Sequence, residues 1–354
     1  MTNYTAKTER SHRVTQRDVA ERAGVAISSV SYVLNKGPRS VSAKTRERVL
    51  QAIEELGYRP NEYAQRLIRH NWGVDAPPRV LGIILAGSRN LIARPYFSAL
   101  IASMLDEAAA QEHEVRFIHP FDELQNPILF NGLINPEVIS GIVLIHRPVH
   151  HEHELLRRVL DRIKNVICVD FNWPDLPSVL IDRHDVGRRV VEYLFNLGHR
   201  EIGYIGFPDE RLNGYSSVMQ SHGVSIQEEF IRKVEFNSPT EGWQETRLLL
   251  SLPTPPTALF AASDEVAIGV LRAARELGVR VPKELSVVGV DDIEMASYVS
   301  PPLTTLQIPK SEMAAFAVRT LINQINQPYS MPINLVFPVK LIERESAVQA
   351  PAAR

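Results

Sequence analysis

The stretch Val14–Asn35, VTQRDVAERAGVAISSVSYVLN, predicts two short helices separated by a turn at a single glycine. Thr15 can cap the first helix, because Asp18 stands three residues later and places a negative charge in the first turn. Gly24 can adopt the left-handed backbone conformation that ends a helix. The second helix is expected from about Ala26 to Leu34. Two amphipathic helices joined by so few residues have the spacing of a helix-turn-helix.

A third helix completes the N-terminal region. Ser42 can cap it, and it is expected to end at the Gly57–Tyr58 pair. Its apolar side chains recur at helical spacing, and the expected buried positions are Val49, Leu50, Ile53 and Leu56. We therefore predict a three-helix domain over residues 12–59.

The charge of the chain is unevenly distributed. The 354 residues carry a net charge of −2, but residues 1–72 contain 13 Lys and Arg against 7 Asp and Glu, which leaves 26 against 34 in the remainder. A basic N-terminal region on an acidic body indicates that only the N-terminal region contacts a polyanion such as nucleic acid.

The composition is that of an ordinary globular protein, with 44% hydrophobic and 23% charged residues. Cys168 is the single cysteine, so an internal disulfide is excluded and nothing indicates an oxidising compartment. No apolar run approaches the roughly 20 residues of a membrane-spanning helix. The first residues are polar and basic, unlike a secretory signal. We expect a cytoplasmic protein with no membrane partner.

From Val80 onward the pattern changes to short apolar runs rich in β-branched residues, such as VLGIILA, GIVLIH, NVICVDF, SVLID, EIGYIGF, ALFAA and LSVVGVDD. Helical stretches lie between several of them, including FSALIASMLDEAAAQ and DEVAIGVLRAARELG. Strands that are buried on both faces and alternate with helices predict a parallel α/β sheet. There are enough units for two lobes.

The motifs together resemble the LacI family of bacterial transcriptional repressors. The resemblance rests on five stretches in the family's order, VTQRDVAERAGVAISSVSYVLN, VSAKTRERVLQAIEELGYRPN, GHREIGYIG, SVVGVDDIEMASYVSPPLTTLQIP and PVKLIERES. It implies an all-α helix-turn-helix DNA-binding head, a hinge helix, and an α/β core of two parallel-sheet lobes similar to periplasmic sugar-binding proteins.

The expected domains follow from this resemblance. The hinge helix and linker occupy residues 60–78, where NEYAQRLIRH is too short to be stable alone as a helix in water. The core spans residues 79–345. It divides into an N-lobe of about 79–175 plus 305–330 and a C-lobe of about 176–304 plus 331–345. Residues 346–354 form a tail that is expected to be disordered.

In such a head the second helix presents its N-terminal and outward side chains to base edges in the major groove. These positions hold Ile27, Ser28, Ser29, Ser31 and Tyr32. Phosphate contacts are expected from the start of the first helix and, by resemblance, from further family positions: Thr15, Gln16, Arg17, Asn35, Ser42, Lys44 and Thr45. Tyr32 stands where the family often has a base-reading Arg or His, so the operator sequence does not follow.

The resemblance also gives the hinge a role. Asn61 and Leu67 match family positions that contact DNA, and Leu67 would be the apolar wedge that two subunits insert together into a minor-groove step. Unstacking this step costs a few kcal/mol, which the contacts of the bent duplex offset. A homodimer on a pseudo-palindromic operator is therefore expected.

Ligands of open α/β sheets bind beyond the carboxyl ends of the strands. Residues just after the apolar runs, with family positions added, give the expected effector contacts Tyr96, Phe97, Asp170, Arg211, Asn237, Ser263 and Asp291. Asp and Arg side chains can together satisfy vicinal hydroxyls, which slightly favours a sugar over a nucleobase. These residues can also have purely structural roles. Tyr96 and Phe97 can simply close the core, and an Asp after a strand is often only a helix cap, as is expected of the nearby Asp264.

Other kinds of site find little support. His150, His151 and His153 lack the i, i+4 spacing of one helix face, so we predict a solvated helix start and no metal. The sequence contains no P-loop or GxGxxG motif, and we expect no cofactor. We predict a ligand-responsive repressor and not an enzyme. The alternatives are a two-lobed sugar-binding or sugar-modifying protein and a constitutive DNA binder without a ligand.

Overall fold

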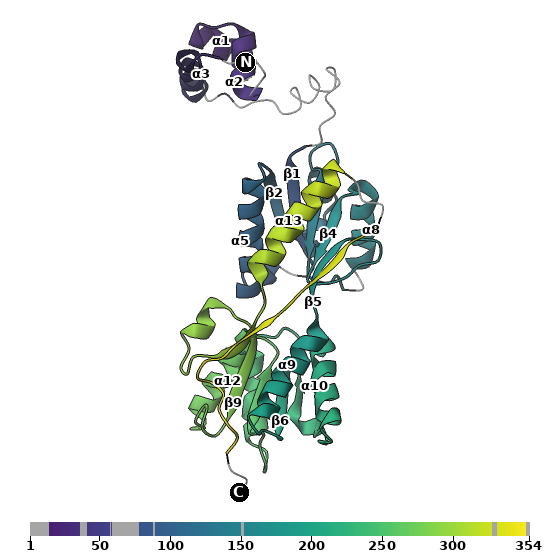
Figure 1. The fold of residues 1–354 in the computed structure, drawn as a ribbon. Helices are drawn as coiled ribbons and strands as arrows, with labels where there is room; N and C mark the ends of the chain where they lie inside the picture. The colour runs from purple at the N-terminus through teal and green to yellow at the C-terminus, as the bar shows by residue number, and fades with distance from the viewer. Residues whose placement is uncertain are drawn as a thin grey trace, which may run out of the picture. The chain divides into compact units, whose positions relative to one another are not determined.

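The computed structural model describes residues 14–35, 41–56, 58, 78–87, 89–149, 152–327 and 331–351. The chain forms two compact units, Met1–Ala76 and Pro77–Arg354, which we call the head and the core and describe separately (Figure 1). The predicted hinge contacts Asn61 and Leu67 lie outside the described residues. Among the helices that are described, none is both long and apolar enough to cross a membrane.

The head contains three helices, α1 (Gln16–Ala23), α2 (Ile27–Asn35) and α3 (Ala43–Leu56). Thr15 caps α1 as predicted, because its hydroxyl accepts a hydrogen bond from the backbone N–H of Asp18 and the Asp18 carboxylate accepts one from the backbone N–H of Thr15. Gly24 follows α1 with φ of 60°, the expected left-handed conformation. The helices share a small apolar core that includes Val19, Val30, Val49 and Ala52.

One predicted core position of α3 is wrong. The Leu50 side chain is 51% exposed, whereas Val49 and Ala52 are buried. Ile53 and Leu56 are partly buried against the same cluster. Residues on one helical face recur three and four positions apart, so Ala52, Ile53 and Leu56 share the face of Val49. Leu50 follows Val49 directly and points about 100° away from it.

The N-lobe is built on a parallel sheet with the strand order β11-β5-β4-β3-β1-β2. Its strands are β1 (Val80–Leu85), β2 (Glu114–Pro120), β3 (Gly141–Ile145), β4 (Val166–Val169), β5 (Ser178–Ile181) and β11 (Asn334–Phe337). Successive side chains point to opposite faces, and both faces are covered. One face packs on α5 (Pro95–Ala110) and α13 (Lys310–Asn326), the other on α6 (Phe121–Leu124), α7 (Pro127–Leu133) and α8 (His153–Arg162).

The C-lobe repeats this plan with the strand order β12-β10-β9-β8-β6-β7, in which β12 runs antiparallel to β10. Its strands are β6 (Ile202–Gly206), β7 (Ile231–Lys233), β8 (Ala258–Ala261), β9 (Ser286–Asp291), β10 (Thr304–Gln307) and β12 (Lys340–Ile342). The helices are α9 (Arg183–Asn196) and α10 (Glu210–Ser221) on one face, and α11 (Pro239–Leu250) and α12 (Asp264–Glu276) on the other. The predicted core of two α/β lobes is confirmed.

The chain passes between the lobes three times, from β5 to α9, from β10 to α13 and from β11 to β12 (Figure 1). The predicted lobe boundaries near residues 175, 304 and 330 therefore differ from the structure. They assign β5 and β11 to the C-lobe and most of β10 to the N-lobe, the reverse of the observed pairing. Each of these three strands is the last one before the chain crosses to the other lobe. A short apolar run fits either sheet equally well, so the sequence does not show with which sheet the strand pairs.

The tail also differs from the prediction, because its described part is bonded to the C-lobe. The buried Ser346 hydroxyl accepts a hydrogen bond from the Thr304 backbone N–H at 2.8 Å and donates one to the Val287 carbonyl at 2.6 Å. The Ala350 N–H donates to the Leu197 carbonyl at 2.7 Å. Disorder was expected for the tail, but its backbone and hydroxyl groups form hydrogen bonds with strands β9 and β10 and with the end of α9.

Candidate functional site

The residues predicted to face base edges are exposed or half-buried on α2, namely Ile27, Ser28, Ser29, Ser31 and Tyr32. Val30 and Val33 lie on the opposite face and are buried. Asn35 is the last residue of α2. The structure therefore separates a polar outer face of this helix from its apolar packing face, as a recognition helix requires.

The first turns of α1 and α3 carry the other predicted DNA contacts that the structure describes, Thr15, Gln16, Arg17, Ser42, Lys44 and Thr45. The Ser42 hydroxyl accepts a hydrogen bond from the Thr45 backbone N–H at 3.2 Å and so caps α3. The remaining N–H groups at these helix starts and the exposed side chains of Arg17 and Lys44 favour a phosphate.

The turn between α1 and α2 is held from α3. The Arg48 guanidinium donates to the carbonyls of Ala23 and Gly24, the second at 2.9 Å. This contact joins residues 24 positions apart and was not predicted from the sequence. It ties the packing of α3 to the angle at which α2 leaves the turn.

In the core, left-handed backbone conformations gather at the carboxyl ends of strands. His146 follows β3 with φ of 66°, Asp170 follows β4 with φ of 71°, and Asp291 ends β9 with φ of 113°. Asn237, after β7, has φ of 51°. Such conformations are costly for residues other than glycine and persist where the surrounding structure imposes them, which is common at binding sites.

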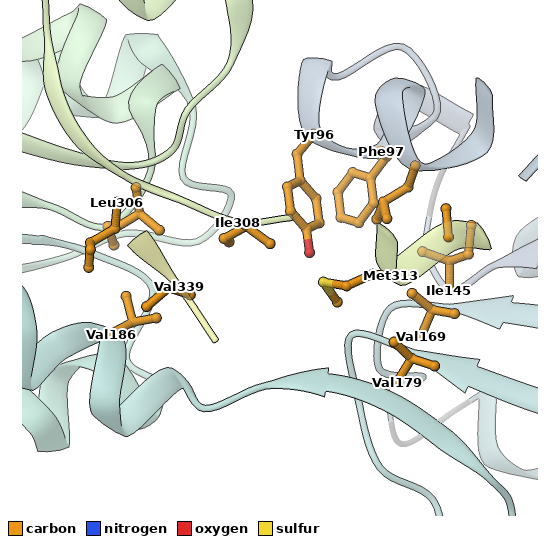
Figure 2. Close-up of a cluster of buried hydrophobic side chains, with 14 of the residues drawn as sticks. Tyr96, Phe97, Ile145, Val169, Val179, Val186, Leu306, Ile308, Met313 and Val339 are labelled. Atoms are coloured by element: carbon orange, nitrogen blue, oxygen red, sulfur yellow. The ribbon is translucent and has the colours of Figure 1, made fainter. Parts of the chain in front are cut away.

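Two buried polar atoms beside these strand ends, the Tyr96 hydroxyl and Oδ1 of Asp170, make no well-formed hydrogen bond within the described residues, although the two side chains lie close enough to interact with each other. Burial and the Asp170 charge raise the pKa of Tyr96 well above its usual value, so its hydroxyl stays protonated. Figure 2 shows the Tyr96 ring beside that of Phe97, with the hydroxyl directed away from α5. Unpartnered buried polar atoms are costly unless a bound molecule completes their hydrogen bonds.

Asp291 contributes a third polar group. Burial raises the pKa of its carboxyl to about 7, although the nearby charges of Lys310 and Arg211 act in the opposite direction. The Lys310 ammonium donates to the backbone carbonyl of Asp291 instead of to its carboxylate. No hydrogen bond joins its carboxyl group to another of the described residues, and 8% of Asp291 remains exposed.

The arginines of this region are already paired with carboxylates. Nη2 of Arg183 lies 2.7 Å from Oδ2 of Asp170, and its Nε lies 3.6 Å from Asp209. Arg211 donates to both carboxylate oxygens of Asp209 and to the Ala262 carbonyl. Burial alone would lower the pKa of Arg211, but Asp209 holds it above its usual value. The guanidinium charges are therefore neutralised inside the protein.

Two of the expected effector contacts have roles within the fold. The Ser263 hydroxyl accepts from the Val266 N–H and donates to the Asn237 carbonyl, so it caps α12. The Asn237 side chain accepts from the Phe207 N–H at 2.7 Å. Asp264, expected to be the cap, instead turns inward and accepts from the Thr305 hydroxyl and the Ile293 N–H.

Three residues of this region, His146, Arg183 and Arg94, were not predicted from the sequence. The His146 ring packs edge-on to that of Phe97, with 5.5 Å between centroids, and burial lowers the pKa of His146 so that its imidazole is neutral near pH 7. His146 directly follows an apolar run, which is the signal that identified Asp170. The partners of Arg183 and Arg94 are distant in sequence, so no local pattern could have identified them.

The metal interpretation gains nothing from the structure. Within the described ranges, no group of three or more His, Cys, Asp or Glu side chains is placed to hold a metal ion. His150 and His151 lie outside those ranges, and His153 packs edge-on to Trp173 with 4.9 Å between ring centroids.

Comparison with known proteins identifies the family. The profile "Bacterial regulatory proteins, lacI family" matches residues 15–61, and "Periplasmic binding protein-like domain" matches residues 191–347. The ribose operon repressor of Escherichia coli (strain K12) is 31% identical over 345 residues, which cover 94% of this chain and 99% of that protein. The chain belongs to the LacI family.

Other comparisons with this LacI-family protein agree. The HTH-type transcriptional repressor PurR of Proteus mirabilis is 30% identical over 95% of the chain and 98% of its own length. A crystal structure of the lac repressor dimer bound to operator and an anti-inducer has a TM-score of 0.76 and 26% identity, and covers 95% of this chain and 100% of that one. LacI-family repressors bind DNA and respond to small-molecule effectors, which confirms the predicted family, fold class and general function. These relatives are repressors and not enzymes.

Proposed function

We propose that this LacI-family protein is a cytoplasmic, homodimeric repressor whose operator affinity is controlled by an uncharged sugar bound between the N-lobe and the C-lobe. The outward residues of α2 would read base edges, and the first turns of α1 and α3 would bind phosphates. Asn35, Asn61 and Leu67 are assigned to DNA by family resemblance. The observation that carries the ligand assignment is the pair of unpartnered buried atoms on Tyr96 and Asp170.

The chemistry of the ligand follows from the groups of Tyr96, Asp170 and Asp291 that can still form hydrogen bonds in the proposed cleft between the two lobes. Asp170 and Asp291 offer carboxylate oxygens that accept hydrogen bonds, and Tyr96 offers a hydroxyl that can donate or accept. The guanidinium groups of Arg183 and Arg211 already have carboxylate partners. A phosphate or carboxylate on the ligand would meet two carboxyl groups as acceptors, and the two guanidinium groups that could balance its charge are already paired with Asp170 and Asp209. A polyol supplies several hydroxyl donors without charge, and Phe97 can pack on its apolar face.

Thermal denaturation of the full chain against matched compounds tests this assignment. Each set contains a neutral sugar and charged derivatives of it, for example ribose with ribose 5-phosphate, and glucose with glucose 6-phosphate and glucuronate. We expect stabilisation by a neutral member alone, and its loss in Asp170→Asn. Stabilisation by a charged member alone would contradict the ligand class. If no compound stabilises a chain that still binds DNA, a constitutive regulator is favoured, and turnover of a sugar would indicate an enzyme.

Fluorescence anisotropy with a duplex from upstream of the protein's own gene tests the DNA half of the proposal. We expect binding that weakens steeply with salt, because phosphate contacts release counterions. The stabilising sugar should change this affinity and leave the affinity for an unrelated duplex unchanged. Equal affinity for both duplexes at physiological salt would contradict sequence-specific recognition.

A further inference from the structure

Arg94 connects the two lobes. It stands at the N-cap of α5 in the N-lobe, and its side chain reaches three acceptors in the C-lobe. Nε donates to the Glu265 carboxylate at 2.9 Å, Nη2 donates to the Asn237 carbonyl at 2.8 Å, and Nη1 donates to the Phe236 carbonyl. The side chains of Arg94 and Glu265 are only 20% and 15% exposed, so solvent screens this ion pair less than a surface pair.

The acceptors are held in place without help from Arg94. The Asn237 carbonyl also accepts from the Ser263 hydroxyl, and the Asn237 side chain is bonded to the Phe207 N–H. Glu265 lies in the first turn of α12, which Ser263 caps. The C-lobe therefore presents the Asn237 carbonyl in a fixed position and the Glu265 backbone on a capped helix, so less conformational freedom is lost when the bonds to the guanidinium form.

The hydrogen bonds of Arg94 lie far from the three crossings that connect the lobes, so they can resist opening of the lobes about those crossings. The three crossings join the lobes where β5 and β11 meet β10 and β12, at one edge of each sheet. Arg94 follows β1, the neighbour of β2 at the opposite edge of the N-lobe sheet. Phe236 and Asn237 follow β7, the opposite edge strand of the C-lobe. We call this side, away from the crossings, the mouth of the cleft.

We propose that Arg94 is a latch that holds the lobes together across the mouth through its own contacts, and that must open for a ligand to enter or leave. Tyr96 lies two residues after Arg94 on α5, so movement of the latch is coupled to one wall of the candidate ligand site. Asp170 and Asp291 lie nearer the crossings, because β4 neighbours β5 and β9 neighbours β10. A ligand that reaches these carboxylates through the mouth has to pass Arg94.

Electron paramagnetic resonance distance measurements on the ligand-free full chain test the latch. Spin labels at Gln125→Cys in the N-lobe and Ser225→Cys in the C-lobe occupy exposed positions. Cys168 is fully buried and should remain unlabelled. An excess of unlabelled chain leaves one labelled subunit in each dimer. In Arg94→Ala we expect a longer distance to appear, with a shift in the closed-to-open ratio of roughly tenfold or more.

The matched control is Arg232→Ala, because Arg232 and Glu245 form a half-buried ion pair of 2.6 Å within the C-lobe. It should leave the distances unchanged. Glu265→Gln should resemble Arg94→Ala, and the double variant should open no further than either single variant. Identical distances in Arg94→Ala and the unsubstituted chain would overturn the latch. Since no ligand is used, this result is independent of whether the proposed sugar is correct.

Discussion

Arg183 at the start of α9 binds Asp170 at the end of β4, so a C-lobe cation pairs with an N-lobe carboxylate at 2.7 Å. The same guanidinium also donates to the Asp170 backbone carbonyl at 3.0 Å. Only Oδ2 of the carboxylate is used, and Oδ1 stays buried without a partner. The pair therefore neutralises Asp170 while leaving one oxygen for a ligand.

Removal of this cation should destabilise the core. Arg183→Met leaves the buried Asp170 carboxylate without its counter-ion, and we expect a loss of about 3–5 kcal/mol in the free energy of unfolding, measured with urea. Arg79→Met is the control, because the Arg79–Glu112 pair is exposed and worth no more than about 1 kcal/mol. Equal effects of the two substitutions would show that burial of the Asp170 pair has no energetic consequence.

The raised pKa of Asp291 predicts a pH-dependent stability. Its carboxyl has a pKa of about 7 in the folded protein and near 3.9 when unfolded, so the folded state binds the proton more tightly. The stability contribution of this group therefore falls as pH rises from about 4 to about 7 and stays low above that. Asp291→Asn should unfold at higher urea than the unsubstituted chain at pH 8, with little difference near pH 4.

The upper limit of this gain is about 4 kcal/mol. Asp106→Asn on the exposed surface of α5 is the control and should show no pH-dependent difference. The same Asp291→Asn chain should lose its response to the sugar. A variant that is less stable at pH 8 and still responds to the sugar would show that Asp291 is a structural group.

Two head residues should separate affinity from specificity. Arg17 is exposed at the start of α1, and Arg17→Ala should weaken binding to all duplexes alike and reduce the slope of log K against log salt by about 1. Tyr32→Ala should leave this slope unchanged and alter the preference among single-base operator variants. Anisotropy titrations measure both. A Tyr32→Ala chain with unchanged base preference would remove Tyr32 from the reading face.

Two neighbouring apolar side chains on the C-lobe mark an expected dimer contact. Tyr298 is 74% exposed and Met295 is 53% exposed, both in or beside a short helical turn after β9. Large apolar side chains exposed close together in the sequence are expected at an interface more than a single exposed one such as Ile128. Tyr298→Glu should raise the dimer dissociation constant in analytical ultracentrifugation at least tenfold, whereas Ile128→Glu, at an exposed N-lobe site, should not. The opposite order would place the interface elsewhere.

Features that depend on near neighbours in the sequence were predictable. The capping box of Thr15 and Asp18 involves residues three positions apart, and Gly24 needs only its own backbone freedom. The strand cores were visible because buried parallel strands are continuously apolar. The position of Asp170 and Asp291 at the carboxyl ends of strands was predictable, because it depends on chain order alone, and their role as ligand contacts stays a prediction.

Features that depend on distant partners were not predictable. Arg94 and Glu265 are separated by 171 residues, and nothing around either residue indicates the other. Whether β5, β10 and β11 belong to the N-lobe sheet or to the C-lobe sheet depends on their pairing with strands from elsewhere in the chain. The prediction that Leu50 is buried was wrong for a different reason. Leu50 is apolar and adjacent to Val49, so it was counted as part of the packing face of α3 although it points away from that face.

The interleaved order of the lobes has a consequence for how the protein is made. Of the core, residues 80–181 leave the ribosome first, but their sheet lacks its edge strand β11 and the covering helix α13 until residues 310–337 have been synthesised. The apolar surface that Met313, Ala317 and Leu321 later cover is thus uncovered while the C-lobe from α9 to β10 is translated. Folding of the N-lobe is completed only after translation of α9 to β10 of the C-lobe, and during that interval the exposed apolar surface of the nascent chain is prone to aggregation.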